Sequence, residues 1–522
     1  MINIYYLSNK DRHSARVIIN ALGLSIDEIK PNNERVVIAL AREGECPETQ
    51  NPVVYVRREE DIISQISEIV SEVVENNMVD ISHINKLDNF RWVSDVDFLS
   101  VVSYLAMREE EYLPTNLDIH GRFNHRYSIL SKLNILERPL LNYIIEFVRR
   151  AFDRILSHCG LVMPYVERWP GSAPFAISIT LDIDHIRKIP LPLSILNPLS
   201  SLKRLRLKDV WKHSRDAVRA ISSSNKVCMD VDRVMESIGG EATIFVGGKR
   251  RHPLDPEVDA FDERAKYLIR AFRDGCVELA LHGSYASILS GENLSEERAH
   301  LEDALGRAVD GVRMHYLRVV LPQTIENMDK EGFIYDSSIG YSDATGFRSG
   351  LALPYKPLYG GNIIELPPSI MDTTLFFKMN IGYDDALSKA VSILDEVEGV
   401  SGYISSISHY KYMVFDEYEL IRRFIVCIRE EIERRGGLIM NCRGVCRWWL
   451  ARSSSRFKVF ASGNALKVEF ELPQLVLDDG RVGFLGQKGA FKVEYEGSKF
   501  DIIESIETKH LKRGSGIFRL VK

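Results

Sequence analysis

The chain of 522 residues carries a formal net charge of -6, and its pI is about 6.2. Apolar residues at 45% and charged residues at 27% are typical of a globular protein, which excludes the disordered and fibrous classes. The acidic balance gives no electrostatic basis for binding nucleic acid, and the length predicts two or three domains.

No targeting or membrane-spanning segment is predicted from the sequence. Met1–Ser8 lacks the basic start and the apolar core of a signal peptide, so we interpret it as a first strand. No stretch approaches the roughly eighteen uninterrupted apolar residues of a transmembrane helix. Seven cysteines, an odd number, are typical of reduced thiols. We therefore expect a cytoplasmic protein.

Residues 1–165 are expected to form an N-terminal domain of α/β and helical structure. Strand and helix signals alternate at first, and apolar residues at three-and-four spacing then predict helices. The expected elements are Ile2–Leu7, Ala15–Leu22, Val36–Ala41, Val53–Val56, Asp61–Val79, Phe98–Tyr112 and Arg138–Leu156. No glycine-rich phosphate loop accompanies them, so nothing indicates nucleotide binding.

A short polar segment, Asp118–Phe123, interrupts the helical part of this domain. It places the side chains of Asp118, His120 and Arg122 close together. Either the segment is a turn that these side chains pin by local hydrogen bonds, or the side chains contact a ligand.

The stretch Phe175–His185 follows a linker rich in proline and glycine and predicts a strand of a second domain. Its apolar, β-branched residues are typical of parallel strands that are buried on both faces. Ligands bind beyond the carboxyl ends of such strands, where Asp182 and Asp184 lie. Residues two apart point to the same face, so both carboxylates are expected in one space, with a cation, a shared proton or water between them.

Strands and helices alternate again over residues 174–450, which predicts a large parallel sheet or a distorted barrel. Side chains able to bind a metal follow several of the strands. The further strands expected are Ala242–Val246, Val277–His282, Val312–Arg318, Ile363–Leu366 and Gly402–His409. Residues 187–235 form an insertion that is long for a crossover and suits a lid or a partner surface.

Residues 455–522 differ from the barrel because their apolar stretches are short, alternating and separated by turn-forming residues. They predict a small C-terminal all-β module built of hairpins.

The expected strand ends carry five side chains that offer oxygen and nitrogen ligands: Asp182, Asp184, His282, His315 and His409. Such a set suits zinc or another divalent first-row metal. A hydrolytic metal site also needs a base that takes a proton from water and an acid that protonates the leaving group. The set is large enough to fill all of these roles.

Five motifs of this region occur together: Thr180–Asp184, Gly239–Val246, Leu281–His282, Gly311–Arg313 and Gly332–Ser338. They resemble the polysaccharide deacetylase superfamily, the carbohydrate esterases with NodB homology. The resemblance covers residues 174–450. Further motifs resemble a branch of this family whose proteins carry an extra N-terminal region: Asp118–Arg122, His282–Ser287, Arg313–Arg318 and Gly346–Gly350. They extend the resemblance back to about residue 95.

The resemblance implies a distorted (β/α) barrel and a metal-dependent hydrolase that removes an acetyl group from an N-acetylated or O-acetylated sugar. Zinc is the metal that we expect. In this family pattern Asp182 would be the general base, with Arg313 orienting it, and Asp184 and His282 would be metal ligands.

The resemblance also implies that His409 is the general acid for the leaving amine and that Asp372 tunes it. A backbone N–H near Tyr316 is expected to stabilise the oxyanion of the tetrahedral intermediate. Arg348 either reaches a phosphate or carboxylate of the substrate through its planar fork or anchors its own loop by a salt bridge.

The sequence departs from the family pattern at one position. The second histidine of the family's metal motif is expected four residues after His282, where this chain has Ala286. His315 replaces a proline of the third motif, and we hypothesise that it completes a triad with Asp184 and His282. The expected function is deacetylation of a glycan precursor in surface polysaccharide biosynthesis. The alternative is a deacetylase fold that has lost catalysis and serves as a carbohydrate-binding or scaffold module.

Overall fold

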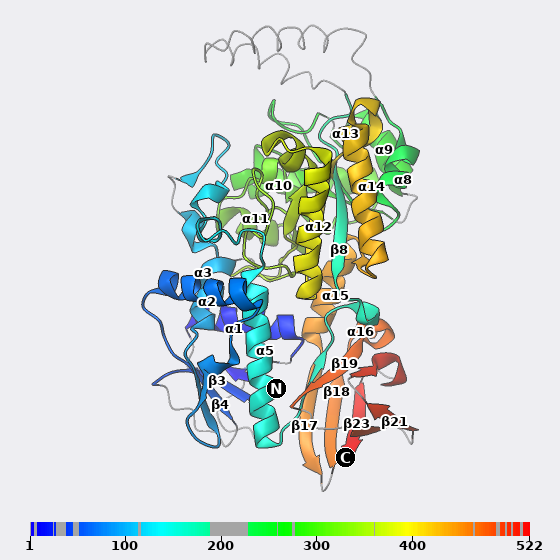
Figure 1. The fold of residues 1–522 in the computed structure, drawn as a ribbon. Helices are drawn as coiled ribbons and strands as arrows, with labels where there is room; N and C mark the ends of the chain where they lie inside the picture. The colour runs from blue at the N-terminus through cyan, green and yellow to red at the C-terminus, as the bar shows by residue number, and fades with distance from the viewer. Residues whose placement is uncertain are drawn as a thin grey trace.

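The structure, a computed structural model, places a large barrel above the sheets of the N-terminal and C-terminal parts (Figure 1). It describes residues 2–4, 8–24, 26–27, 38–44, 52–112, 116–187, 228–257, 259–273, 277–359, 361–462, 465–486, 491–495, 498–502, 505–511 and 515–521. Of the insertion expected over residues 187–235, residues 188–227 lie outside this set.

The N-terminal part is built on a six-stranded sheet in the order β2-β1-β3-β4-β6-β5, parallel except between β5 and β6. Its helices α2 and α3 lie on the side of the sheet that faces the barrel (Figure 1). The bounds are β1 Ile2–Ile4, α1 Asn9–Leu22, β2 Ile26–Asp27, β3 Ile38–Arg42, β4 Val53–Val56, α2 Ile62–Asn76, β5 Ile84–Lys86, β6 Arg91–Ser94, α3 Phe98–Ala106 and α5 Leu140–Cys159.

Local sequence explains where these helices begin and end. The side chains of Ser8 and Asp61 accept hydrogen bonds from backbone N–H groups in the first turns of α1 and α2. Gly160, with a φ of 65°, ends α5 in the left-handed conformation that glycine adopts without strain. The helix expected over Phe98–Tyr112 is shorter, because α3 ends at Ala106.

The central part is a nine-stranded parallel sheet that curls into a distorted barrel, which confirms the expected fold class. Its order is β13-β12-β11-β10-β9-β8-β15-β14, and β16 pairs with the start of β8. The strands are β8 Ala176–Asp182, β9 Thr243–Gly247, β10 Glu278–Gly283, β11 Gly311–Met314, β12 Tyr335–Asp336, β13 Ile364–Glu365, β14 Pro368–Met371, β15 Tyr403–His409 and β16 Leu438–Ile439.

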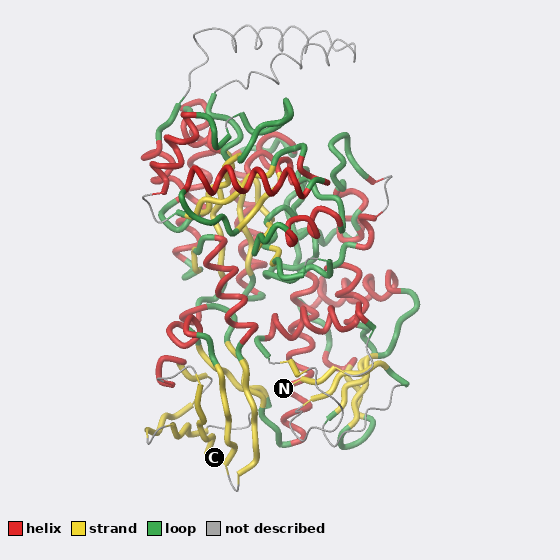
Figure 2. Tube along the Cα trace, turned by 180° about the vertical axis from the view of Figure 1, so that it is seen from behind, coloured by secondary structure: helices red, strands yellow, loops and turns green. Residues whose placement is uncertain are grey.

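Helices surround this sheet, as Figure 2 shows from behind. They are α8 Val231–Ile238, α9 Glu263–Arg273, α10 Gly291–Leu305, α11 Gln323–Lys330, α12 Tyr383–Gly399, α13 Tyr410–Val414 and α14 Glu419–Arg434. Alternation along β8 sends Ile179 and Leu181 into the core under the helices, whereas Thr180 and Asp182 bond to residues inside the barrel. The apolar side of the sheet therefore holds the helices, and the polar side is left for chemistry.

The C-terminal part, expected to be all-β, consists mainly of strands but also contains a short helix, α16 Gln474–Asp479. Five antiparallel strands are ordered β17-β18-β23-β20-β21, and a three-stranded sheet is ordered β22-β19-β7. The bounds are β7 Met163–Val166, α15 Cys442–Ser454, β17 Arg456–Ser462, β18 Ala465–Glu471, β19 Arg481–Leu485, β20 Phe491–Tyr495, β21 Ser498–Ile502, β22 Ser505–Glu507 and β23 Ser515–Val521. Since β7 precedes the barrel and β19 follows it, the two ends of the barrel segment meet in this small sheet.

Candidate metal centre and active site

The carboxyl ends of the barrel strands bring the predicted residues to one cavity of about 230 Å³. Asp182 ends β8 and His409 ends the neighbouring strand β15, where the two residues lie directly opposite each other. Asp184, His282 and His315 line the same cavity. All five ligand candidates from the sequence therefore converge, as the rule for parallel sheets leads one to expect.

Asp184 lies between two histidines. Its Oδ1 is 3.0 Å from Nε2 of His282, and its Oδ2 is 3.4 Å from Nε2 of His315. One ligand atom of each of the three residues lies within 4.8 Å of the others. The convergence required by the hypothesis of an Asp184, His282 and His315 triad is therefore present.

The protonation of this group fits a divalent cation. Nδ1 of His282 lies 2.9 Å from the carbonyl oxygen of Arg313, which can only accept, so Nδ1 donates to it and Nε2 is the nitrogen that faces Asp184 and would bind a metal. Burial alone would raise the pKa of Asp184, but His315 and His282 hold it well below its usual range. An ionised carboxylate and two imidazoles are ligands typical of zinc.

Asp182 is held by a buried guanidinium. Its Oδ1 accepts a hydrogen bond of 2.8 Å from Nη1 of Arg313, whose side chain is fully buried. Arg313 is fixed in turn, because it donates to the hydroxyl of Thr180 at 2.6 Å and to the carbonyl and hydroxyl of Ser337 at 2.9 and 2.8 Å. The other carboxylate oxygen, Oδ2, points to the histidines and lies 3.8 Å from Nε2 of His282. The arrangement leaves one oxygen of Asp182 available to a reactant.

His409 is paired with Asp372, which follows β14 and is fully buried. Nδ1 of His409 lies 2.6 Å from Oδ1 of Asp372, and the backbone N–H of His409 donates to Oδ2 at 2.8 Å. Burial would lower the pKa of His409, but the carboxylates of Asp372 and Asp184 raise it to about 9. Its Nε2 faces the cavity, 3.6 Å from Asp184. This imidazolium can donate a proton into the cavity at neutral pH.

The strand expected over Val312–Arg318 is wrong beyond Met314, where β11 ends. The backbone turns there, since Tyr316 and Leu317 have φ values of 64° and 54°, which no strand accommodates. The resulting turn presents both His315 and Tyr316 to the cavity. The proposed contact of a backbone N–H near Tyr316 with an oxyanion stays a prediction.

The N-terminal part completes the cavity with His120 and Arg122. Asp118 pins their turn, because its carboxylate accepts from the N–H of His120 at 2.8 Å and from Nε of Arg122 at 2.8 Å. The pinned turn then reaches the barrel. Nη1 of Arg122 donates to the carbonyl of Tyr316 at 3.2 Å, and the rings of His120 and Tyr316 are 4.9 Å apart. The segment Asp118–Phe123 is therefore a turn pinned by local hydrogen bonds, and two of its side chains also line the cavity.

Sequence reasoning missed two lysines, Lys378 and Lys411, that line the cavity. Lys378 is exposed, whereas burial lowers the pKa of Lys411. The ammonium of Lys411 lies 4.8 Å from the ring centre of Tyr412. A signal was present, because Lys411 follows the predicted strand end at His409 by two residues.

Arg348 is not among the residues that line this cavity. It is 4% exposed and donates to both carboxylate oxygens of Glu111, at 3.0 and 2.7 Å, and to the carbonyl of Gly340 at 2.9 Å. Of the two interpretations of Arg348, this geometry favours the salt bridge that anchors the loop. Its partner in the N-terminal part was not foreseen.

None of the helices in the described part of the chain combines the length and the apolar composition that crossing a lipid bilayer requires.

Comparisons with known proteins give partial likenesses. Residues 34–157 match a family described as a family of unknown function, DUF7033, and comparison with curated proteins finds no match. A Mycobacterium smegmatis protein assigned as a polysaccharide deacetylase is 18% identical, with a TM-score of 0.38, over 55% of this chain and 94% of its own.

Two further solved structures are similar over different lengths. The Puue allantoinase is 18% identical, with a TM-score of 0.36, over 54% of this chain and 92% of its own. Agd3, a carbohydrate deacetylase, is 10% identical, with a TM-score of 0.35, over 100% of this chain and 98% of its own. The solved structures that the chain resembles thus include polysaccharide and carbohydrate deacetylases, at low identity.

Proposed function

We propose that the protein is a metal-dependent hydrolase that removes an acetyl group from an acetylated sugar. The observation that supports this most is the convergence of five side chains on one cavity. These are the Asp184, His282 and His315 triad, together with Asp182 and His409. Behind the cavity lining, Arg313 pairs with Asp182 and Asp372 pairs with His409. Together they supply metal ligands, a base and an acid, which are the parts that amide hydrolysis needs.

Asp184, His282 and His315 would hold the divalent cation, for which zinc is the proposed metal. When bound, such an ion polarises a carbonyl and lowers the pKa of water towards about 7. Asp182 then acts as the base. Its Oδ2 accepts the proton of the attacking water, while Arg313 holds Oδ1 and keeps the carboxylate from turning away.

His409 acts as the acid on the leaving nitrogen or oxygen. Because Asp372 holds Nδ1, the proton on Nε2 is directed into the cavity. Donation of that proton leaves a neutral imidazole and a neutral leaving amine or alcohol. Asp372 also stabilises the charged form, so that His409 is protonated before the reaction.

The assignment of a sugar as substrate rests on the motif resemblance and on the rim of the cavity. His120 and Tyr316 line the cavity with their ring centres 4.9 Å apart, and Tyr285 packs beside Tyr316 with ring centres 5.7 Å apart. Aromatic faces of this kind offer an apolar surface with polar edges. We propose a glycan or glycan precursor of surface polysaccharide biosynthesis as the substrate.

Acetate release from N-acetylglucosamine oligomers and from N-acetylated sugar nucleotides tests this function. The zinc-loaded protein is expected to release acetate, the chelated protein is not, and the Asp182→Asn protein is expected to release it far more slowly. Stoichiometric zinc without acetate release from any of these substrates would favour the alternative, a carbohydrate-binding module on a hydrolase fold.

A further inference from the structure

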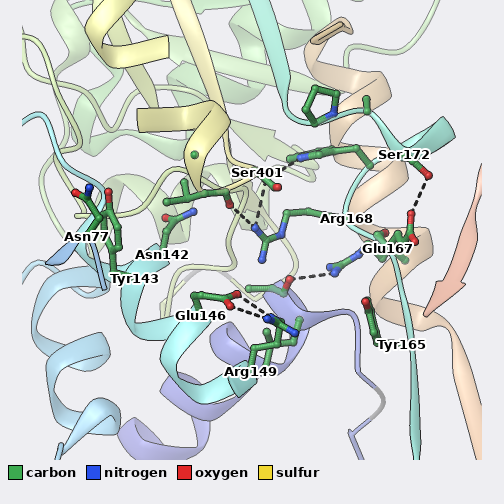
Figure 3. A pocket seen from close by; sticks show the side chains of 18 residues that line it. Asn77, Asn142, Tyr143, Glu146, Arg149, Tyr165, Glu167, Arg168, Ser172 and Ser401 are labelled. Carbon is green, nitrogen blue, oxygen red and sulfur yellow. Dashed lines mark hydrogen bonds and ion pairs between the residues drawn. The ribbon is translucent and has the colours of Figure 1, made fainter. Parts of the chain in front are cut away.

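A second cavity, of about 410 Å³, lies where the N-terminal part meets the barrel (Figure 3). We call it the junction cavity. It is lined by residues of α5, of the segment before β8, of the loop after α12 and of α15, among them Tyr143, Glu146, Arg149, Arg168, Ser401 and Arg452. Of the lining residues that the structure describes, none is shared with the active-site cavity. Nothing in the proposed function uses it.

Arg168 extends into the junction cavity between Ser401 and the Glu146–Arg149 pair, as Figure 3 shows. Its Nη1 donates to the carbonyls of Val400 and Ser401, at 2.6 and 3.3 Å. Within the described chain, no atom accepts from its Nε or Nη2, and no carboxylate forms an ion pair with it. The side of the guanidinium formed by Nε and Nη2 is therefore available to a ligand.

The chain itself shows what this side of a guanidinium binds. In the same cavity, Nε and Nη2 of Arg149 hold the two carboxylate oxygens of Glu146, at 2.8 and 2.7 Å (Figure 3). Two parallel N–H donors match the two oxygens of a carboxylate or phosphate. Arg168 offers the same pair of donors with no acid to fill it.

Arg452 adds a second positive charge without a carboxylate. It is 2% exposed, and its guanidinium donates only to backbone carbonyls among the described residues, those of Asn20, Ala21, Val166 and Glu167. Burial lowers its pKa, and the nearby charge of Arg168 lowers it further. Buried cations that face carbonyls alone raise the electrostatic potential of the space beside them.

The acids of the junction cavity do not cancel this charge. The carboxylate of Glu146 is occupied by Arg149, and that of Glu167 accepts from the hydroxyl of Ser172 at 2.9 Å. Three arginines therefore face two glutamates in the lining, and an excess of one positive charge is left near Arg168.

We propose that the junction cavity binds a small organic anion, with its carboxylate or phosphate on Nε and Nη2 of Arg168. The volume lies within the range of about 300–1,000 Å³ found for small-molecule sites. The rings of Tyr143 and Tyr165 line the space that the body of such a ligand would occupy. An anion here would contact segments from both sides of the junction, so binding is expected to raise the melting temperature of the whole chain.

Isothermal titration of the full, zinc-loaded chain tests the proposal, with inorganic phosphate and D-glucuronate as probes and D-glucose as the neutral control. One saturable site is expected for at least one of the two anions and none for glucose. Arg168→Gln is expected to weaken that site at least about tenfold, because a charged bidentate hydrogen bond is lost. Asp184→Asn, which alters the metal centre, is expected to leave it unchanged.

A second variant covers the case in which Arg168→Gln fails to fold, since Arg168 also binds the end of α12. Glu146→Gln removes one negative charge and frees the donors of Arg149, so it is expected to tighten anion binding several-fold. Two results would overturn the proposal. One is that neither anion shows saturable binding. The other is that Asp184→Asn abolishes the binding, while Glu146→Gln leaves it unchanged or weakens it.

Discussion

Nε2 of His315 lies 3.4 Å from Oδ2 of Asp184, just beyond the end of the strand that pairs with the strand of His282. The turn after the neighbouring strand thus supplies a histidine to the group, although Ala286 stands where the family resemblance leads one to expect the second histidine. The three side chains that the proposal needs as ligands therefore lie together. The metal itself remains part of the proposal.

We expect His315→Ala to lose stoichiometric zinc, because the two remaining protein ligands are fewer than the three that a catalytic zinc site has beside its open position. The apparent zinc affinity should fall by at least about 100-fold, as measured by competition with a chelator and by elemental analysis. His83→Ala is the matched control, since His83 pairs with Glu72 far from the cavity lining. Full zinc content in the His315→Ala protein at equal purity would rule out the triad.

The change Asp182→Asn is expected to separate catalysis from metal binding. The amide keeps an oxygen for Arg313 but cannot take a proton, so the rate of acetate release should fall by about 10²–10⁴-fold. Zinc content should stay close to one equivalent. Acetate release within a few-fold of the unmodified protein would show that another group is the base.

The Asp372→Asn change is expected to move the alkaline limb of the pH profile to lower pH. The acid form of His409 is needed, so activity is lost as the pH rises through the pKa of His409 in the folded protein, which Asp372 helps to raise to about 9. Without that carboxylate, burial dominates and the pKa falls. The measurement is kcat/KM against pH.

Asp343→Asn serves as the control for this profile, because Asp343 pairs with His125, at 3.0 Å, outside the cavity lining. An alkaline limb that Asp372→Asn does not shift would exclude His409 as the acid.

His120→Ala tests the contribution of the N-terminal part to substrate binding. Loss of the ring beside Tyr316 should lower kcat/KM for an N-acetylated sugar oligomer by about three- to tenfold, mainly through KM. Hydrolysis of p-nitrophenyl acetate, which has no sugar ring, should change little, and zinc content should not change. Equal losses for both substrates would mean that His120 supports the fold of the site.

Arg348→Leu is expected to destabilise the protein without affecting substrate binding by the folded fraction. Glu111 would lose one of its buried guanidinium partners, and breaking such a pair costs about 3–5 kcal/mol. A lower melting temperature with an unchanged KM is the expected result. A raised KM with unchanged stability would instead support the substrate contact.

Much of the barrel and of the site is predictable because their signals are local. A buried β-branched run that ends in Asp182 and Asp184 predicts both a strand and a polar strand end. The same reasoning finds His282 and His409 at the ends of β10 and β15. In a parallel sheet, strand ends meet at one edge, so convergence follows from topology.

The remaining features depend on contacts between distant segments. The pairing of β7 with β19 joins residues 163–166 to residues 482–485, and no local pattern encodes it. The left-handed turn at Tyr316 is held by Arg122 from another part of the chain. Glu111 and Arg348 similarly meet only in the folded protein, which is why the sequence left two interpretations of that arginine open.

Acetate release by the full, zinc-loaded chain is the most direct test of the proposed activity. With N-acetylglucosamine oligomers and N-acetylated sugar nucleotides as substrates, we expect release that stops on chelation and returns with zinc. It should fall by about 10²–10⁴-fold in the Asp182→Asn protein, which still contains the metal. Release that is the same with and without zinc, or none from any substrate by a protein with one bound zinc, would contradict the account.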